Sequence, residues 1–473
     1  MPSILFATSE ARPLIKTGGL ADVSGALPNA LKHIGIDCRI LLPGYRQVMA
    51  ALPDLRQAAY FHELPNFGNV TLREGTLPGS EVPVYVIDSP WHYQRDGGPY
   101  QDATGRDFPD NAWRFGLLSR IAALLAGPDS PLDWHPDLLH GNDWQTGLAP
   151  AYLHYAGHRT PTVMTIHNLA HQGIFPPEMV EELGLPPESF DISGVEYYGN
   201  LSFLKAGLYF ADWITTVSPS YAREIQHAHL GMGMQGLLFG RRHSLTGILN
   251  GIDTADWDPA NDPHLKHPYS ARATSGKKQC KQALQEEMGL TVDPHAPLFG
   301  VVSRLADQKG LDWILAVAPG ILDRGGQLVV LGTGEKPIEK ALRKLAQNRP
   351  GRMAAFIGYD EALSHRIEAG IDIFLMPSRF EPCGLNQMYS LRYGAVPVVH
   401  ATGGLKDTVA DGVTGFVYHK SDAHNLWLAI ERALALYADK PAWRKMMLAG
   451  MQQDFSWENS ARQYAELYGR LLA

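Results

Sequence analysis

The sequence has few of the features that mark secreted or membrane proteins. Its 473 residues include only three cysteines, Cys38, Cys280 and Cys383, which are far apart and form no Cys-x-x-Cys pair. This scatter argues against a disulfide framework and against a zinc site of the usual spacing, and it favours a reducing compartment. No apolar run reaches the roughly 20 residues that cross a bilayer. The N-terminus also lacks the basic stretch of a signal peptide, so we expect a cytoplasmic protein.

An excess of positive charge is also missing. Lys and Arg number 41 against 49 Asp and Glu, which gives a net charge of −8. We therefore expect no binding to nucleic acid or to an anionic membrane, whereas a neutral polymer stays open as a partner. The sequence contains no P-loop and no Gly-x-Ser-x-Gly motif. Its one Gly-x-Gly-x-x-Gly, at residues 231–236, follows a polar segment instead of a strand, so we interpret it as a loop.

Two series of short apolar strands alternate with helical stretches along the chain. The first series runs over residues 3–217 and the second over residues 298–417, with a segment rich in Pro, His and Asp between them at 259–277. This alternation predicts an α/β fold with parallel sheets that helices cover on both faces. We predict two Rossmann-like domains of similar size, facing a central cleft, and a final helix that begins near Ser456. The irregular segment 56–80 fits a hairpin insertion.

The stretch 378–408 carries most of the information. Its predicted strand, 396–399, lies between two glycine-containing loops, which carry Glu381 and the Gly403-Gly404 pair. Both loops open toward the same edge of a parallel sheet, and each precedes a helix N-terminus, where α/β proteins bind anionic ligands. Alone, each residue fits a surface carboxylate or a turn glycine. Their convergence in about thirty residues favours a binding site.

Basic residues follow the first strand of each series. Lys16 lies in Lys-Thr-Gly-Gly-Leu, and Arg304 and Lys309 lie in Ser-Arg-Leu-Ala-Asp-Gln-Lys-Gly. The glycines after Lys16 let the backbone approach a ligand, and the following helix presents N–H groups to it. The three cations would stabilise a departing diphosphate without a metal. The alternative is that they are solvated loop residues, which is the usual state of such side chains.

Taken together, these motifs resemble those of the glycogen and starch synthase family. The likeness spans nearly the whole chain and is carried, in this order, by residues 16–20, 303–310, 379–385, 394–397 and 402–405. It implies a GT-B glycosyltransferase fold with an acceptor-side domain at 1–248, a donor-side domain at 249–455, and a terminal helix at 456–473 that packs on the first domain. It also implies transfer of glucose from ADP-glucose to the non-reducing end of glycogen or a linear α-1,4-glucan. Retention at the anomeric carbon and no metal or other cofactor are expected.

The resemblance also implies roles for individual residues. The expected catalytic residues are Glu381, His167, Arg304, Lys309 and Lys16. The expected substrate-binding residues are Lys16, Gly18, Gly19, Asp22, Tyr100, Asp143, Trp144, Asn168, Gly332, Thr333, Tyr359, Cys383, Gly384, Leu385, Thr402, Gly403 and Gly404. We find no convincing carboxylate pair of the kind that a retaining hydrolase uses. We therefore expect the acceptor to attack from the face that the phosphate leaves.

Residue types alone leave other interpretations open. His167 and the aromatic residues near it suit a hydrophobic core, Tyr359 suits an exposed rim, Gly332-Thr333 suits a plain turn, and Cys383 suits a small buried filler. At the level of the whole chain, a related sugar-nucleotide transferase, a phosphorylase with covalent pyridoxal phosphate, or a non-catalytic glucan-binding protein would share much of this pattern. The preference for ADP over UDP rests on the resemblance alone.

Overall fold

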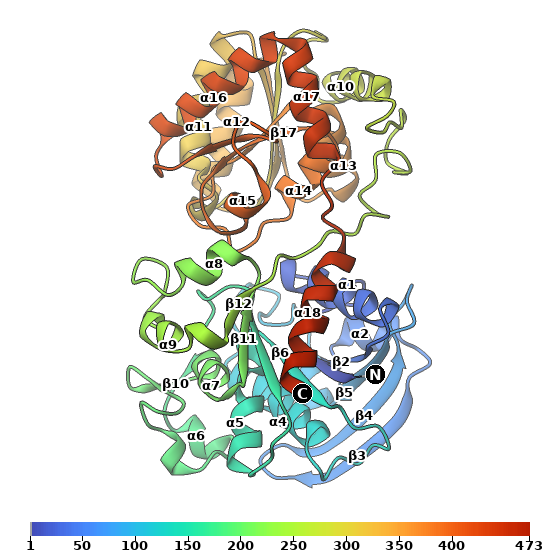
Figure 1. Cartoon of the computed structure of the whole chain (residues 1–473), viewed down its shortest axis with the longest axis vertical. Coiled ribbons are helices and arrows are strands. Elements are labelled where there is room, and N and C mark those ends of the chain that lie inside the picture. The colour runs from blue at the N-terminus through green and yellow to red at the C-terminus, as the bar shows by residue number, and fades with distance from the viewer. Residues whose placement is uncertain (1) are drawn as a thin grey trace. The chain divides into compact units, whose positions relative to one another are not determined.

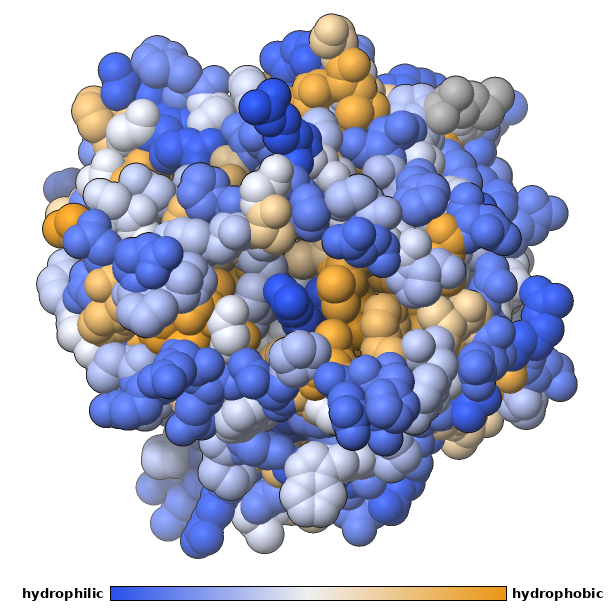
Figure 2. Space-filling model, turned by 90° about the horizontal axis from the view of Figure 1, so that it is seen from below, coloured by the Kyte–Doolittle hydropathy of each residue, from blue (hydrophilic) through white to orange (hydrophobic). Residues whose placement is uncertain are grey.

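The computed structural model describes residues 2–473 and divides them into two compact units. Unit 1 contains the chain up to Gly251 together with Trp457–Ala473, and unit 2 contains Ile252–Ser456. Within residues 2–473, the helices are too short or too polar for any of them to cross a lipid bilayer. The face drawn in Figure 2 is largely hydrophilic, with its apolar residues in separate patches.

Unit 1 is built on a nine-stranded sheet (Figure 1). Its strands are β1 (Ser3–Ala7), β2 (Asp37–Pro43), β3 (Arg56–Leu64), β4 (Gly68–Thr76), β5 (Pro83–Asp88), β6 (Leu138–Asn142), β7 (Thr162–Ile166), β11 (Trp213–Thr216) and β12 (Leu245–Gly247). They lie in the order β12-β11-β7-β6-β1-β2-β5-β4-β3. The strands from β12 to β5 pair in parallel, whereas β3, β4 and β5 pair antiparallel. The hairpin predicted at 56–80 is thereby confirmed.

Helices cover both faces of this sheet. They are α1 (Gly19–His33), α2 (Arg46–Ala51), α3 (Pro90–Tyr93), α4 (Asn111–Ala126), α5 (Leu148–Tyr155), α6 (Met179–Glu182), α7 (Phe203–Phe210), α8 (Pro219–Glu224), α9 (Gln235–Gly240) and α18 (Trp457–Leu472). Short 3-10 turns lie at Trp144–Thr146, Pro187–Ser189 and Arg242–Ser244, and β8 (Ile174–Phe175), β9 (Glu196–Tyr197) and β10 (Asn200–Ser202) form a small separate sheet.

The last helix of the chain belongs to the core of unit 1. In Figure 1, α18 (red) lies beside α1, although the two are at opposite ends of the sequence. Its Tyr464 and Tyr468 are buried, and the Tyr468 hydroxyl is 2.7 Å from Nδ1 of His140, in the middle of β6. Tyr464 and Tyr468 lie on the same side of α18, because residues three or four apart share one side of a helix.

Unit 2 has a six-stranded, fully parallel sheet. Its strands are β13 (Leu298–Val302), β14 (Gln327–Gly332), β15 (Met353–Ile357), β16 (Ile373–Met376), β17 (Val396–His400) and β18 (Phe416–Tyr418). The surrounding helices are α10 (Ser275–Glu287), α11 (Leu311–Asp323), α12 (Lys336–Asn348), α13 (Glu361–Gly370), α14 (Asn386–Arg392), α15 (Gly403–Thr408), α16 (Ala423–Ala438) and α17 (Lys440–Met451), with a 3-10 turn at Asp307–Lys309. The strands are almost wholly apolar because both faces of a parallel sheet are buried.

Both sheets have the Rossmann strand order. In unit 2 the order is β15-β14-β13-β16-β17-β18. The chain starts at β13, adds β14 and β15 on one side of it, and then adds β16, β17 and β18 on the other side. Unit 1 repeats the arrangement around β1, with β2 on one side and β6 on the other. Ligands of such sheets bind beyond the carboxyl ends of the two strands where the direction changes. The loops after β1 and β6, and after β13 and β16, are therefore the places to look for a site.

Candidate active site

In unit 2, hydrogen bonds join the loop after β13 to the loop after β16. The Arg379 amide donates to the Gln308 carbonyl at 2.8 Å, and the Gln308 side chain donates to the Phe380 carbonyl at 3.2 Å. Gly310 has a φ of +68°, and a Cβ there would lie 2.3 Å from the Pro377 carbonyl oxygen. Glycine is thus required where the two loops meet. The loop that carries Arg304 and Lys309 is held against the loop that carries Glu381.

Glu381 is the centre of this arrangement. Its Oε2 accepts a hydrogen bond from Lys309 Nζ at 2.5 Å and another from the Ser378 hydroxyl at 2.9 Å. The side chains are 9% and 15% exposed for Glu381 and Lys309. A largely buried carboxylate is tolerable only when it is paired and hydrogen-bonded, and both conditions are met here. Two predicted catalytic residues that are far apart in the sequence are therefore in direct contact.

The glycine pair at the start of α15 packs directly on the Glu381 loop. A Cβ on Gly403, whose φ is +43°, would lie 1.9 Å from the Glu381 carbonyl oxygen, and one on Gly404 would lie 2.1 Å from the Cys383 carbonyl oxygen. The Gly404 amide donates to the Glu381 carbonyl at 3.2 Å. No other residue type fits this approach. Gly403 and Gly404 thus pack on the backbone that positions Glu381, and Thr402 precedes them as the N-cap residue of α15.

The other predicted residues of unit 2 lie along the same edge of the sheet. Gly384 has a φ of +74° and precedes Leu385, the N-cap residue of α14, while the Cys383 side chain is buried. Thr333 follows Gly332 at the end of β14, and its hydroxyl donates to Glu339 Oε1 at 3.0 Å. Tyr359 is 77% exposed after β15. The exposed ring leaves a flat aromatic face open to solvent, as a stacking role requires.

In unit 1, the loop after β1 is organised by a residue that the sequence analysis missed. Glu10 is 2% exposed, and one of its carboxylate oxygens accepts the backbone N–H groups of Thr17 and Gly18. The other oxygen accepts the Thr17 hydroxyl, at 2.6 Å, and the Tyr100 hydroxyl. The Gly18 amide donates to Glu10 at 3.4 Å, and its contact with a substrate stays a prediction. A carboxyl group directly after the first strand was the available signal.

Lys16 and Asp22 form an ion pair beside this carboxylate. Lys16 Nζ lies 2.7 Å from Asp22 Oδ1, with side-chain exposures of 40% and 16%. A Cβ on either Gly18 or Gly19 would meet no atom within 4 Å. The Lys16 ammonium is thus partly open to solvent, next to a stretch of backbone with free space beside it. This geometry suits the approach of an anionic group.

Asp143 and His167 adjoin the carboxyl ends of β6 and β7. Asp143 adopts a φ of +56°, and its Oδ1 accepts the His167 amide at 2.7 Å and the Asn168 amide at 3.4 Å. Burial raises the pKa of Asp143 to about 7 despite these bonds. Burial also lowers the pKa of His167 to about 3. His167 is therefore a neutral imidazole at physiological pH.

The neighbouring hydrogen bonds fix the tautomer of His167. Asn142 donates its side-chain amide to the Ala7 carbonyl at 3.0 Å, so its Oδ1 faces His167 Nε2 at 2.9 Å. Because Oδ1 can only accept, Nε2 carries the proton and Nδ1 keeps a lone pair. His167 thus offers a hydrogen-bond acceptor at Nδ1 and no positive charge.

Trp144 and Tyr100 are partly buried and pack against the core of unit 1. The Trp144 ring contacts the rings of Phe115, Phe175 and Phe203 at centroid distances of 4.9, 5.7 and 5.9 Å. Burial raises the pKa of the Tyr100 hydroxyl well above its usual value. The backbone around Tyr100 is held by buried Arg114, which donates to the Pro99 carbonyl at 2.7 Å. Arg114 was also missed, because a lone arginine within a helix carries no sequence signal.

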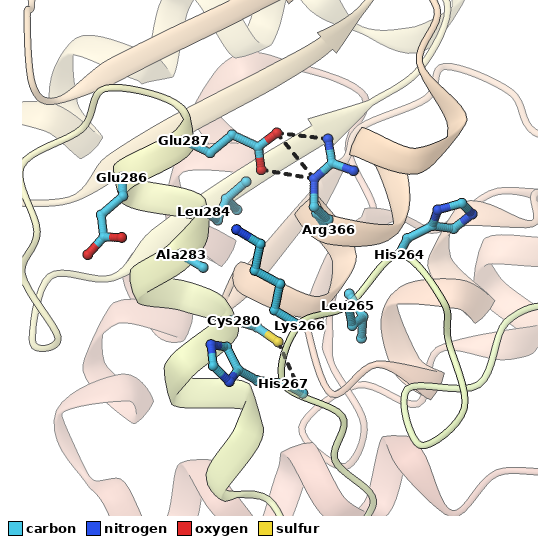
Figure 3. Close-up of a pocket in the computed structure, with 10 residues that line it drawn as sticks. All are labelled: His264, Leu265, Lys266, His267, Cys280, Ala283, Leu284, Glu286, Glu287 and Arg366. Atoms are coloured by element: carbon cyan, nitrogen blue, oxygen red, sulfur yellow. Dashed lines mark hydrogen bonds and ion pairs between the residues drawn. The ribbon is translucent and has the colours of Figure 1, made fainter.

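A cavity of about 410 Å³ lies elsewhere in unit 2 (Figure 3). It is lined by residues of the 264–267 loop, of α10 and by Arg366 on α13, and none of the predicted site residues borders it. The site at the switch point of unit 2 is therefore defined by its polar contacts and not by this cavity.

Two Rossmann-type units, each with a cation and paired glycines in loops that follow strands of its parallel sheet, define a glycosyltransferase of the GT-B class. Residues 3–239 match the starch synthase catalytic domain family, and residues 288–446 match the group 1 glycosyl transferases. The chain belongs to the glycogen and starch synthase family.

Individual relatives agree with this assignment. A glycogen synthase of Nitrosospira multiformis is 55% identical over 99% of this chain and 97% of its own length, and one of Nitrosomonas europaea is 54% identical over 100% and 98%. The catalytic domain of starch synthase IV from Arabidopsis thaliana, solved with ADP and acarbose, has 33% identity and a TM-score of 0.88 and covers 100% of this chain and 99% of its own. Sucrose-phosphate synthase from Thermosynechococcus elongatus shares the fold, at 19% identity and a TM-score of 0.61.

Proposed function

We propose that the protein transfers the glucosyl group of ADP-glucose to the non-reducing end of an α-1,4-glucan such as glycogen, with retention at the anomeric carbon. The observation that carries this proposal is the buried contact of Lys309 and Ser378 with Glu381 at the switch point of unit 2, where the Lys309 loop also carries Arg304. A fixed carboxylate can hold sugar hydroxyls, and adjacent cations can hold a diphosphate. Relatives named glycogen synthase over the full chain support the acceptor.

The choice of ADP rests on a relative. The starch synthase IV catalytic domain was solved with ADP, and it matches this chain over its whole length. Within unit 2, the exposed Tyr359 ring after β15 is the proposed stacking surface for the adenine base. Stacking accepts any base, so the preference for adenine over uracil rests on the relative and is tested by the assay below.

In the proposed reaction, the bond between glucose C1 and the diphosphate oxygen breaks, and its electron pair leaves with ADP. The 4-hydroxyl of the terminal glucan residue bonds to C1 from the same face and passes its proton to the departing phosphate oxygen. Arg304 and Lys309 stabilise the charge that develops on the diphosphate, with Lys16 as a third cation. Glu381 holds the glucose while C1 gains oxocarbenium character.

His167 is proposed to act by hydrogen bonding and not by charge. Its neutral ring presents Nδ1 as an acceptor, which suits a sugar hydroxyl. Because the low pKa of about 3 comes from burial, protonation of this ring would require unfavourable desolvation of a cation. The histidine therefore does not serve as the general acid for the leaving phosphate.

The test is a two-donor assay on the full chain. Purified protein is mixed with glycogen and either ADP-glucose or UDP-glucose, with no added metal, and both nucleotide release and glucose incorporation are measured. Glucose incorporation chiefly from ADP-glucose, in α-1,4 linkages by proton NMR, is expected. Nucleotide release without glucan growth would contradict the proposed acceptor. Incorporation chiefly from UDP-glucose would contradict the proposed donor.

Arg349→Ala is the matched control for substitutions of the site cations. Arg349 follows α12 and pairs on the surface with Asp323 at 2.7 Å, where both side chains are substantially exposed. Exposed pairs of this kind contribute about 0–1 kcal/mol. The control variant should keep wild-type kcat and KM.

A further inference from the structure

We propose that unit 2 contains a zinc site formed by Asp256, Glu361 and His365, separate from the candidate active site. Each of the three side chains offers one ligand atom, and these atoms lie within 4.8 Å of one another. The ligands come from the segment that opens unit 2 and from the first two turns of α13. An ion bound there would link the opening segment of unit 2 to α13.

His365 is held as a metal-ligating histidine is usually held. It is 1% exposed, and its Nδ1 lies 2.8 Å from Asp262 Oδ2. Histidine ligands usually donate one ring N–H to a carboxylate, which fixes the tautomer and leaves the other nitrogen for the metal. The indole of Trp257 stacks on the imidazole at 3.7 Å with 14° between the planes, so the ring cannot swing away. Nε2 is therefore left as the coordinating atom.

Asp262 acts as the support and not as a ligand. The Tyr393 hydroxyl donates to its Oδ2 at 2.6 Å, and the His264 amide donates to its Oδ1 at 2.8 Å. Both oxygens are thus engaged with protein donors. A carboxylate held on both oxygens in the interior orients the imidazole ring firmly, because each of its bonds is charge-assisted.

The two carboxylates and the imidazole suit zinc in number and type. Zinc binds His nitrogen at about 2.0–2.1 Å and carboxylate oxygen at about 2.0–2.2 Å, with water in a remaining position. A tetrahedron of that size separates ligand atoms by roughly 3.4 Å. Asp256 and Glu361 are partly exposed, and the three ligand atoms lie within 4.8 Å of one another. Exposure also gives the ion a path from solvent.

Basic groups near the cluster do not cancel its negative charge. Arg366, on the same helix, donates to both carboxylate oxygens of Glu287 at 2.7–3.2 Å, as the dashed lines of Figure 3 show. Figure 3 also places His264 at the edge of the pocket. The His264 ring packs edge-on against His365, with centroids 4.9 Å apart. The pocket and the proposed zinc site therefore share a wall.

The site is also joined to a residue of the candidate active site. The Tyr359 hydroxyl donates to Glu361 Oε2 at 3.2 Å. The cluster could not be predicted from the sequence, because residues 256, 361 and 365 lack the close spacing of a zinc motif. The proposed zinc site is separate from the Lys309–Glu381 contact, where we expect glucosyl transfer without a metal.

Zinc binding to the metal-free full chain tests the proposal. Protein stripped by a chelator is titrated with Zn²⁺ against a chromogenic competitor, and Co²⁺ replaces Zn²⁺ as a spectroscopic reporter. We expect one ion per chain, a cobalt spectrum of nitrogen and oxygen ligands without a thiolate band, and a rise in Tm of several degrees. Asp256→Asn and Glu361→Gln should each weaken binding at least tenfold, and the double variant should abolish it.

The control is Glu286→Gln. Glu286 is an exposed pocket residue on α10 that accepts one hydrogen bond from Gln282, and its loss should leave zinc affinity unchanged. Asp256 and Glu361 are not core residues, so circular dichroism of their variants should match the wild type. Failure of the wild-type chain to bind zinc at micromolar concentration would overturn the proposal. Binding of equal affinity in the double variant would overturn it as well.

Discussion

Replacing the buried carboxylate of Glu10 tests whether this residue acts by holding the Lys16 loop in place. In Glu10→Gln, the amide oxygen can keep the two backbone N–H groups, and the amide nitrogen can donate to the hydroxyls of Thr17 and Tyr100 if both rotate. The shape of the Lys16 loop is then possible, but every bond is neutral. Charge-assisted hydrogen bonds are about twice as strong as neutral ones, with net contributions of roughly 1.5–3 against 0.5–1.5 kcal/mol.

The expected loss follows from the number of bonds. Weakening two of the shorter contacts by about 1 kcal/mol each destabilises the loop conformation by about 2 kcal/mol. If turnover requires this conformation, the same free energy lowers kcat/KM by roughly 30-fold. The assay is kcat/KM for ADP-glucose at saturating glycogen. Tm measured in parallel separates this local loss from unfolding of unit 1.

A double variant identifies the route of the effect. If Glu10 acts through the Lys16 loop, Lys16→Ala combined with Glu10→Gln should be little worse than Lys16→Ala alone. Glu81→Gln is the control, since Glu81 is exposed and only its backbone carbonyl is hydrogen-bonded, to Lys32. A Glu10→Gln enzyme within threefold of the wild type would refute the reasoning. Multiplicative losses in the double variant would show that Glu10 acts independently of Lys16.

Other substitutions test the remaining features. Arg304→Ala and Lys309→Ala should each lower kcat by about 10²–10³-fold through lost stabilisation of the leaving group, with little change in glycogen affinity by co-sedimentation; unchanged turnover would remove their assigned role. Burial raises the pKa of Asp143 to about 7 from an ordinary 3.8, so the native state keeps a proton that the unfolded chain has released. The protonated Asp143 stabilises the fold fully below about pH 4, and this stabilisation is lost as the pH rises to 7. In Asp143→Asn, the free energy of unfolding should no longer fall over this pH range. An equally steep fall in urea titrations of the variant would contradict the assignment. Gly403→Ala should lower kcat/KM for the donor at least tenfold, because its Cβ would lie 1.9 Å from the Glu381 carbonyl oxygen; wild-type kinetics would show that the loops can separate without consequence.

The sequence was enough to predict the loops that carry the candidate site. Alternating strand and helix patterns and paired glycines depend on local backbone physics, which neighbouring residues report. The loops of Lys309 and Glu381 could therefore be placed at one sheet edge. Their direct contact could not be predicted, because it depends on the β13–β16 pairing and on the close fit of Gly310 against Pro377.

What the sequence did not reveal is the set of residues that hold others in place. Glu10, Arg114 and Asp262 each act on groups that are distant in the chain or on backbone atoms, and neither kind of contact leaves a spacing pattern. The surroundings of Trp144 depend on tertiary packing in the same way, because its ring contacts three phenylalanine rings from separate elements.

The place of α18 sets the order in which the chain can fold on the ribosome. Unit 2 is one continuous stretch and can fold as soon as it has emerged. Unit 1 is started first but lacks Tyr464 and Tyr468 for its core until the final helix is made. At roughly 5–20 residues per second, the core face of unit 1 that α18 covers stays exposed for about 10–40 seconds while unit 2 is synthesised. A nascent chain that stalls after Ser456 should therefore recruit chaperones to its first half and not to its second.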